Sequence, residues 1–214
     1  MAMAGLAAAG GMRAENWPAW RGTDGNGASD DGGTPASFSP TRNLAWKVEL
    51  PGRGCSTPVV WGEQIIVTCP IDGRDGVLAY DRAGKELWRV SLGKARPGRG
   101  QRVGSACNSS PLTDGKHVFV YFKSGNLAAL TMAGKVVWKM NVFEKYGEDK
   151  LWWDVGTSPV FANGNLMLAV LQSEGNSFLV SLDKATGKEV WLTPRKYEGG
   201  PESGDAYTTP HVVE

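Results

Sequence analysis

Charged and aromatic side chains that could bind a ligand gather in three stretches of the sequence. One stretch is a Gly-Arg-Gly triplet, the second is basic and rich in glycine and proline, and the third is acidic and aromatic. Arginine and tryptophan are enriched at the energetic centres of protein interfaces. We predict a surface for a protein partner or polar ligand; the alternative is solvated loops whose tryptophans pack locally. The candidate residues are Arg53, Arg96, Arg99, Arg102, Trp152, Trp153 and Asp154.

Few residues are suited to metal or nucleophilic chemistry. The cysteines, Cys55, Cys69 and Cys107, form no Cys-x-x-Cys pair, and the only histidines are His117 and His211. A zinc site normally needs such residues at short spacing. We therefore predict no catalytic, cofactor-binding or metal-binding residue, and leave the question of an enzyme open with a leaning against it.

Composition favours a soluble all-β protein. The 214 residues include 29 glycines and 12 prolines, and the short apolar runs between them are typical of strands and tight turns. The formal net charge of +1 gives no reason to expect nucleic acid as a partner. Apart from the N-terminus, no stretch approaches the roughly 18 apolar residues of a membrane span.

The N-terminal region is predicted to be an export signal followed by an irregular segment. Residues 1–14 are mostly small and apolar and resemble the end of a signal peptide cleaved near Ala14, although a basic start is missing. This favours a periplasmic or secreted protein, with a disordered N-terminus as the alternative. Residues 15–43 are rich in Gly, Asp and Ser, and we expect Trp17 and Trp20 to pin this lead-in onto the folded body.

The candidate loops must be positioned by a repeat, and a hairpin motif occurs three times. Each copy has an apolar strand, an Asp or Thr, a turn with Gly, and a second strand that contains Trp. We predict that the turn glycines and tryptophans are structural. The repeat residues are Asp81, Gly84 and Trp88, then Gly134 and Trp138, then Asp183, Gly187 and Trp191.

A second marker runs in step with the hairpins. Triplets of two hydroxyl residues and a proline end at Pro58, Pro111, Pro159 and Pro210, at intervals of 53, 48 and 51 residues. Each of the first three precedes a turn, a β-rich run and then a hairpin, which gives four strands per repeat. Four antiparallel strands every 40 to 50 residues, roughly, indicate a β-propeller, with the proline at the start of the innermost strand.

At this point the sequence resembles a known family, the pyrroloquinoline-quinone-type propeller repeats, whose blades carry Ala-x-Asp-x-x-Thr-Gly-Lys-x-x-Trp. The stretch from Asp183 to Trp191 matches nearly in full, the first copy lacks the Thr, and the second has Thr131 in place of the Asp. The resemblance covers residues 44–214. It implies a propeller of seven or eight blades, so that this chain would be the N-terminal portion of a longer protein, or would close by pairing with another copy.

The predicted organisation is an all-β partial propeller with about three complete blades. We expect a closing strand at 44–50, blades at 51–91, 92–141 and 142–194, and the start of another blade at 195–214. Cys55 and Cys107 would lie in equivalent places of adjacent blades, where a disulfide is conceivable but buried free thiols are favoured.

Three functions remain open, two implied by the resemblance and one suggested by the tryptophan pair. The first is an exported, non-catalytic scaffold similar to the propeller subunit of the outer-membrane barrel-assembly machinery, with a protein or polar ligand at one mouth and no cofactor. The second is a fragment of a quinoprotein dehydrogenase, which would need pyrroloquinoline quinone and calcium to oxidise alcohols or sugars. The third is a polysaccharide- or peptide-binding module that uses Trp152 and Trp153.

Overall fold

Three four-stranded antiparallel sheets follow one another along the chain in the computed structural model, which describes residues 15–32, 35–99, 104–196, 198–200 and 203–213. In each sheet the strands lie in chain order. The first contains β1 (Val59–Trp61), β2 (Gln64–Ile71), β3 (Arg74–Asp81) and β4 (Glu86–Lys94). The second contains β5 (Leu112–Thr113), β6 (His117–Tyr121), β7 (Asn126–Thr131) and β8 (Val136–Asn141). The third contains β9 (Val160–Ala162), β10 (Asn165–Val170), β11 (Phe178–Leu182) and β12 (Glu189–Pro194).

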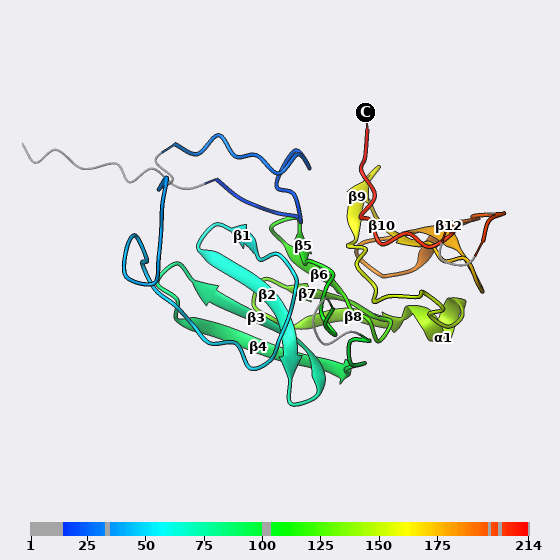
Figure 1. Ribbon diagram of the computed structural model, residues 1–214, viewed down its shortest axis with the longest axis horizontal. Helices are drawn as coiled ribbons and strands as arrows, with labels where there is room; N and C mark the ends of the chain where they lie inside the picture. The colour runs from blue at the N-terminus through cyan, green and yellow to red at the C-terminus, as the bar shows by residue number, and fades with distance from the viewer. Residues whose placement is uncertain (1–14, 33–34, 100–103, 197, 201–202, 214) are drawn as a thin grey trace, which may run out of the picture.

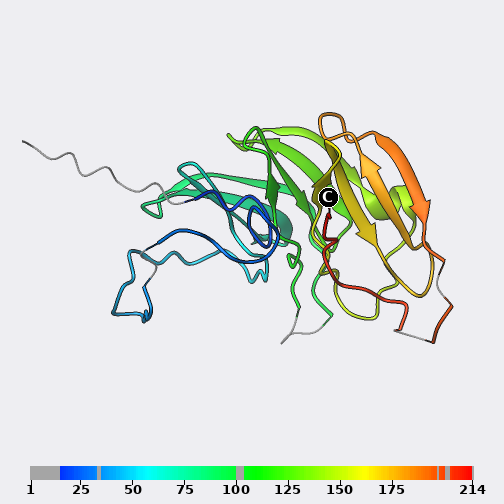
Figure 2. The same ribbon diagram turned by 90° about the horizontal axis from the view of Figure 1, so that it is seen from above.

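The sheets are arranged as successive blades of a partial propeller (Figures 1 and 2). One core lies between the first two blades, where Ile66 and Val77 meet Val120, and a second lies between the last two, where Phe119 meets Leu168. Each blade begins directly after its marker proline. The predicted fold class, an all-β partial propeller with four-stranded blades, is confirmed.

Two of the three hairpin tryptophans, Trp88 and Trp138, reach across to the next blade. The Trp88 indole donates to the Met132 carbonyl at 2.9 Å and the Trp138 indole donates to the Lys184 carbonyl at 2.9 Å. The same rings lie directly over the turn glycines Gly134 and Gly187, where a Cβ atom would come within 2.7 Å of the ring. A glycine is therefore required at these turns both for its positive φ and for the space that the ring takes.

The hydroxyl residues of the triplets link neighbouring blades near the propeller centre. The Thr57 amide donates to the Ser110 hydroxyl, and the Ser110 amide donates to the Ser158 hydroxyl, both at 2.9 Å. The Ser158 amide donates to the Thr209 hydroxyl at 3.0 Å. These side chains satisfy backbone donors that the innermost strands leave unpaired, which explains why the triplets carry hydroxyls as well as proline.

Replacing Ser158 by alanine is expected to lower the free energy of unfolding by about 1–3 kcal/mol, because the buried amide of Ser110 loses its acceptor. Chemical denaturation of the full chain measures this change. Ser158→Thr is the matched control: it keeps the hydroxyl, as Thr209 does in the next triplet, and should retain more stability than the alanine variant. Equal losses in both variants would show that the hydroxyl has no such role.

The segment before the first blade runs alongside the innermost strands of the first two blades and forms backbone hydrogen bonds with them. Trp17 and Val60 exchange two backbone hydrogen bonds of 2.8 and 2.9 Å, and the Thr113 amide donates to the Pro18 carbonyl at 2.9 Å. Residues 44–50, expected as a closing strand, form no strand. A strand needs a ladder partner, and the blade that residues 44–50 would complete is absent from the described residues. Trp46 nevertheless lies over Gly84 and donates to the Arg82 carbonyl at 2.7 Å.

Candidate functional site

Ion pairs around Asp149 join the two rim loops that carry most of the candidate residues; of these loops the structure describes residues 95–99 and 104–111 in the first and 147–159 in the second. This carboxylate is buried, and its Oδ2 atom lies 3.3 Å from Arg96 Nη1 and 3.4 Å from Arg99 Nη2. Its Oδ1 atom accepts a hydrogen bond from the Leu151 amide. The basic and acidic sectors expected from the sequence therefore meet on one rim, and Asp149 neutralises part of the arginine charge.

Asp154 forms a second link between the same loops. Both of its oxygens accept the Arg99 amide, at 2.9 and 3.0 Å, and Oδ1 forms an ion pair with Lys123. The Lys123 side chain is only 1% exposed, so Asp154 balances a charge that has almost no access to water. A charge in such a place needs a partner, because desolvation is costly. Asp154 therefore holds the two rim segments together.

Trp152 and Trp153 project from the third-blade side of this rim, with exposed fractions of 61% and 46%. Two hydrogen bonds hold their backbone in place. The Trp152 amide donates to the Asp205 carboxylate at 2.8 Å, and the Trp153 amide donates to the Tyr207 hydroxyl at 3.2 Å. Asp205 also accepts the Ser173 amide at 2.7 Å. Burial alone would raise the pKa of Asp205, but these hydrogen bonds outweigh it and lower the pKa.

The buried Gln172 amide fixes the rest of the loop. Its oxygen accepts the Lys150 amide at 2.8 Å, while its nitrogen donates to the carbonyls of Glu148 and Asn176. One side chain thus ties the rim loop to the loop between β10 and β11. The two tryptophans stand on a backbone held at several points, although their rings face solvent.

The remaining candidates are Arg53 and Arg102. Arg53 is exposed on the loop before β1, whereas Arg102 lies outside the described part of the chain. At the inner end of the rim, a pocket of about 550 Å³ opens beside Trp153. Its other lining residues are Cys55, Gly104, Asn108, Asp154, Gly156 and Tyr207.

All three cysteines are free thiols in the structure. The Cys55 amide donates to the Cys107 carbonyl at 3.0 Å, so the two segments adjoin, but Cys55 is exposed whereas Cys107 is buried. Burial raises the pKa of Cys107 well above its usual value, which makes it a poor nucleophile.

Sequence reasoning missed Gln172 and Asp205, described above, and also two buried charged residues, Lys123 and Asp75. Asp75 is fully buried between the first two blades and accepts hydrogen bonds from Ser124 and Asn126, and burial raises its pKa. The signal for both was a charged residue at the end of an apolar strand run. Neither belongs to a metal site: among the described residues, no group of three or more His, Cys, Asp or Glu side chains is placed to hold a metal ion. No helix in that part of the chain is long and apolar enough to cross a membrane.

Comparisons with known proteins give one sequence family and several solved structures. The model of a family described as outer membrane protein assembly factor BamB matches residues 28–212. No curated protein matches the chain. The solved structures include quinohemoprotein alcohol dehydrogenase ADHIIG from Pseudomonas putida HK5, with 19% identity over 70% of this chain and 22% of that chain, at a TM-score of 0.48. Quinohemoprotein alcohol dehydrogenase from Comamonas testosteroni shows 22% identity over 67% of this chain and 21% of that chain, with a TM-score of 0.48.

BamB from Moraxella catarrhalis shows 19% identity over 70% of this chain and 51% of that chain, with a TM-score of 0.42. The chain spans about a fifth to a half of the length of these three proteins. The family match covers far more of the sequence than half, and it agrees with the predicted propeller repeats. The chain belongs to the family described as outer membrane protein assembly factor BamB.

Proposed function

We propose that the chain is an exported, non-catalytic scaffold that binds a protein partner through its rim, in the assembly of outer membrane proteins that the family description names. The observation that carries the proposal is the pair of exposed rings, Trp152 and Trp153, on a backbone fixed by Asp205 and Tyr207. The family match supports the class of process, and the small, apolar residues at 1–14 support export to the periplasm.

A fixed aromatic pair favours binding for a physical reason. Two large apolar rings in water gain free energy when a partner covers them, and a backbone that is already ordered loses little entropy on association. Arg96 and Arg99 extend the same surface, because their side chains are 44% and 32% exposed while Asp149 holds one end of each. The surface therefore combines apolar area with arginine donors, the residue types that dominate interface energetics.

Substitution of both rings tests the proposal. The Trp152→Ala, Trp153→Ala double variant is expected to bind a detergent-solubilised barrel-assembly complex, stripped of its own propeller subunit, about 100-fold more weakly than the unchanged chain. This loss corresponds to about 2.8 kcal/mol, which is in the range for truncation of an interface hot spot. Surface plasmon resonance gives the two dissociation constants. Thermal melting of both proteins should agree, because the rings face solvent.

Phe38→Ala provides the matched control, because Phe38 is 78% exposed on the lead-in segment and lies outside the rim loops. It should bind like the unchanged chain. Equal binding by the double tryptophan variant would refute the rim as the contact surface. Dye reduction with an alcohol after addition of pyrroloquinoline quinone and calcium to the full chain would refute the non-catalytic scaffold.

A further inference from the structure

Asp75 carries a carboxyl group in surroundings that disfavour a negative charge. The residue lies on β3 at the junction between the first two blades and is 0% exposed. Its Oδ2 atom is hydrogen-bonded to the Ser124 hydroxyl and to the Asn126 side-chain amide, the latter at 2.7 Å. Its Oδ1 atom has no hydrogen-bond partner among the described residues. A buried carboxylate needs donors on both oxygens, because a charged oxygen that loses water and gains no donor keeps its full desolvation cost.

Asp75 forms no ion pair with any described residue. Its neighbour Arg74 is exposed, and the guanidinium donates to a backbone carbonyl of β4 at 3.4 Å. Lys94, which lies opposite Arg74 on β4, is exposed as well. Lys123 comes from the second blade, but its charge is held by Asp154. Because a buried charge normally has a charged partner, the carboxyl group of Asp75 is unusual in this protein.

Cys107 is a second titratable group at this junction. It is fully buried in the core between the first two blades, and burial, followed by the nearby Asp75, raises the pKa of its thiol. A neutral thiol offers no positive charge to a carboxylate. Burial also raises the pKa of Asp75, and the hydrogen bonds with Ser124 and Asn126 and the field of Arg74 do not outweigh it. These surroundings favour the neutral acid, whose hydroxyl can share the bond with Ser124 and whose other oxygen carries no full charge.

The partners of Asp75 connect it to helix α1 (Val142–Tyr146). The Asn141 side-chain nitrogen donates to the Ser124 carbonyl at 3.1 Å and to the Asn126 side-chain oxygen at 3.3 Å. The Asn141 side-chain oxygen caps the helix, because it accepts two amides of the first turn at 3.0 and 3.1 Å. The two residues that hold the Asp75 carboxyl therefore also hold the residue from which α1 starts.

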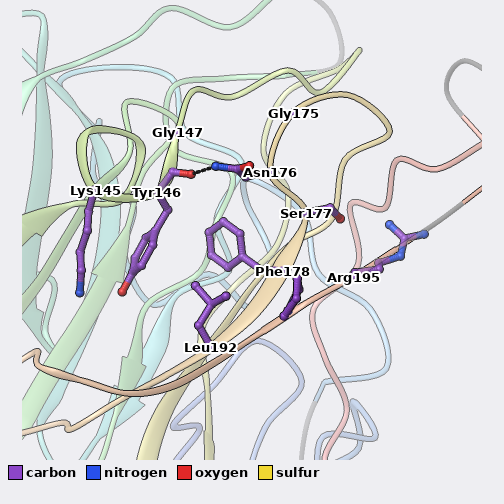
Figure 3. A pocket seen from close by; sticks show the side chains of 10 residues that line it. Lys145, Tyr146, Gly147, Gly175, Asn176, Ser177, Phe178, Leu192 and Arg195 are labelled. Carbon is purple, nitrogen blue, oxygen red and sulfur yellow. Dashed lines mark hydrogen bonds between the residues drawn. The ribbon is translucent and has the colours of Figure 1, made fainter.

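The far end of α1 contacts the third blade (Figure 3). The Tyr146 carbonyl accepts a hydrogen bond from the Asn176 side chain, and the Tyr146 ring packs against Phe178 with 5.1 Å between the ring centres. Residues 147–159, the rim loop with the exposed tryptophans, continue from this helix. Contacts that begin at the Asp75 carboxyl thus reach all three described blades and the start of this rim loop.

We propose that Asp75 is a pH-sensitive joint between the first two blades: the closed junction holds the neutral acid, and ionisation at higher pH favours an opening that lets water reach the carboxylate. The unfolded chain releases the Asp75 proton at the usual pH for an aspartate, whereas the folded chain, in which the pKa is raised, releases it at a higher pH. The stability that the neutral acid contributes is therefore fully present below the unfolded-state pKa and is lost as the pH rises through the folded-state pKa. The joint does not depend on the proposed function, because it uses neither Trp152 nor Trp153.

A direct titration of the unchanged full chain tests the protonation state. The carboxyl carbons of ¹³C-labelled aspartates are followed by NMR as the pH is raised. The Asp75 carbon is expected to titrate at a higher pH than that of Asp72, which is exposed in the turn that precedes β3. Titration of Asp75 at the same pH as Asp72, or at a lower pH, would overturn the proposal. This measurement needs no variant, so it holds even if a substitution at Asp75 prevents folding.

Urea unfolding across the same pH range tests the effect on stability. Asp75→Asn keeps the shape of the neutral acid and cannot ionise. The unfolding equilibrium constant of the unchanged chain, divided by that of Asp75→Asn, should rise with pH by up to about tenfold per pH unit while only the unfolded chain has Asp75 ionised. Asp72→Asn is the matched control from the same hairpin, and its ratio should stay constant. A ratio for Asp75→Asn that does not change with pH would refute the joint.

The three free cysteines report where the chain opens. A thiol reagent is added to the unchanged chain and to Asp75→Asn at one pH above the titration of Asp75, and peptide mass analysis follows each cysteine. Cys107 should react several-fold faster in the unchanged chain, because the junction opens there. Cys55 is exposed and Cys69 is buried in a separate core of the first blade, so both should react equally in the two chains. Equal rates at Cys107, or the same gain at Cys69 as at Cys107, would contradict a local joint.

Discussion

Replacing Lys123 by methionine is expected to lower the free energy of unfolding by about 3–5 kcal/mol. Methionine fills a similar volume, but among the described residues the buried Asp154 carboxylate then keeps only the Arg99 amide as its partner. An uncompensated charge in a place with almost no access to water is the costly part of such a change. Urea unfolding of the full chain, followed by tryptophan fluorescence, measures the loss.

A second substitution separates charge from packing. In the Lys123→Met background, Asp154→Asn should restore part of the lost stability, because it removes the unpaired charge and can still accept the Arg99 amide. In the unchanged chain, the same Asp154→Asn substitution should destabilise. Lys150→Met is the control for the loss of an exposed pair, since Lys150 and Glu148 are largely solvated, and it should cost less than about 1 kcal/mol. Equal effects of Asp154→Asn in both backgrounds would contradict a buried ion pair.

Trp138→Ala is expected to cost about 3 kcal/mol or more, because it removes a large ring from the junction between the second and third blades. It also leaves the Lys184 carbonyl without the indole donor. Trp138→Phe keeps most of the ring area and should lose less. The same unfolding measurement ranks the two variants, and equal stability of Trp138→Ala and the unchanged chain would show that the ring does not join the blades.

The turn glycine beneath the ring offers a complementary test. Gly187 has φ +71° and a Cβ atom there would lie 2.7 Å from the Trp138 ring, whereas Gly164 has φ +76° with open space around it. Gly164→Ala should therefore show the cost of backbone strain alone, about 1 kcal/mol. Gly187→Ala should cost clearly more. If the two variants lost the same stability, the ring contact would not account for the repeated glycine.

The fold could be read from the sequence because its information is local and repeated. Each strand follows either a marker proline or a turn or loop with a recognisable residue such as Gly115 or Gly164, and the same order recurs in all three repeats. The hydroxyls at Ser110 and Ser158 were visible as markers, but their role was not, since each acts on an amide about 50 residues earlier. The sequence pattern predicts the four strands of each blade, whereas the hydrogen bonds between blades are visible only in the three-dimensional structure.

The candidate site was predictable only in part, for a related reason. Residue type and loop position were enough to select Arg96, Arg99, Trp152 and Trp153. The contact of both arginines with Asp149 joins loops about 50 residues apart and leaves no pattern in the sequence.

The central claim is that the exposed tryptophan pair on the rim is a contact surface for a protein partner. The most direct measurement places a photo-reactive amino acid at position 152 of the chain expressed in cells, and at position 38 as the control, and identifies the cross-linked products by mass spectrometry. We expect position 152 to cross-link to a component of the barrel-assembly machinery and position 38 to give no such product. The absence of that product from position 152, or an equal yield from both positions, would contradict the account.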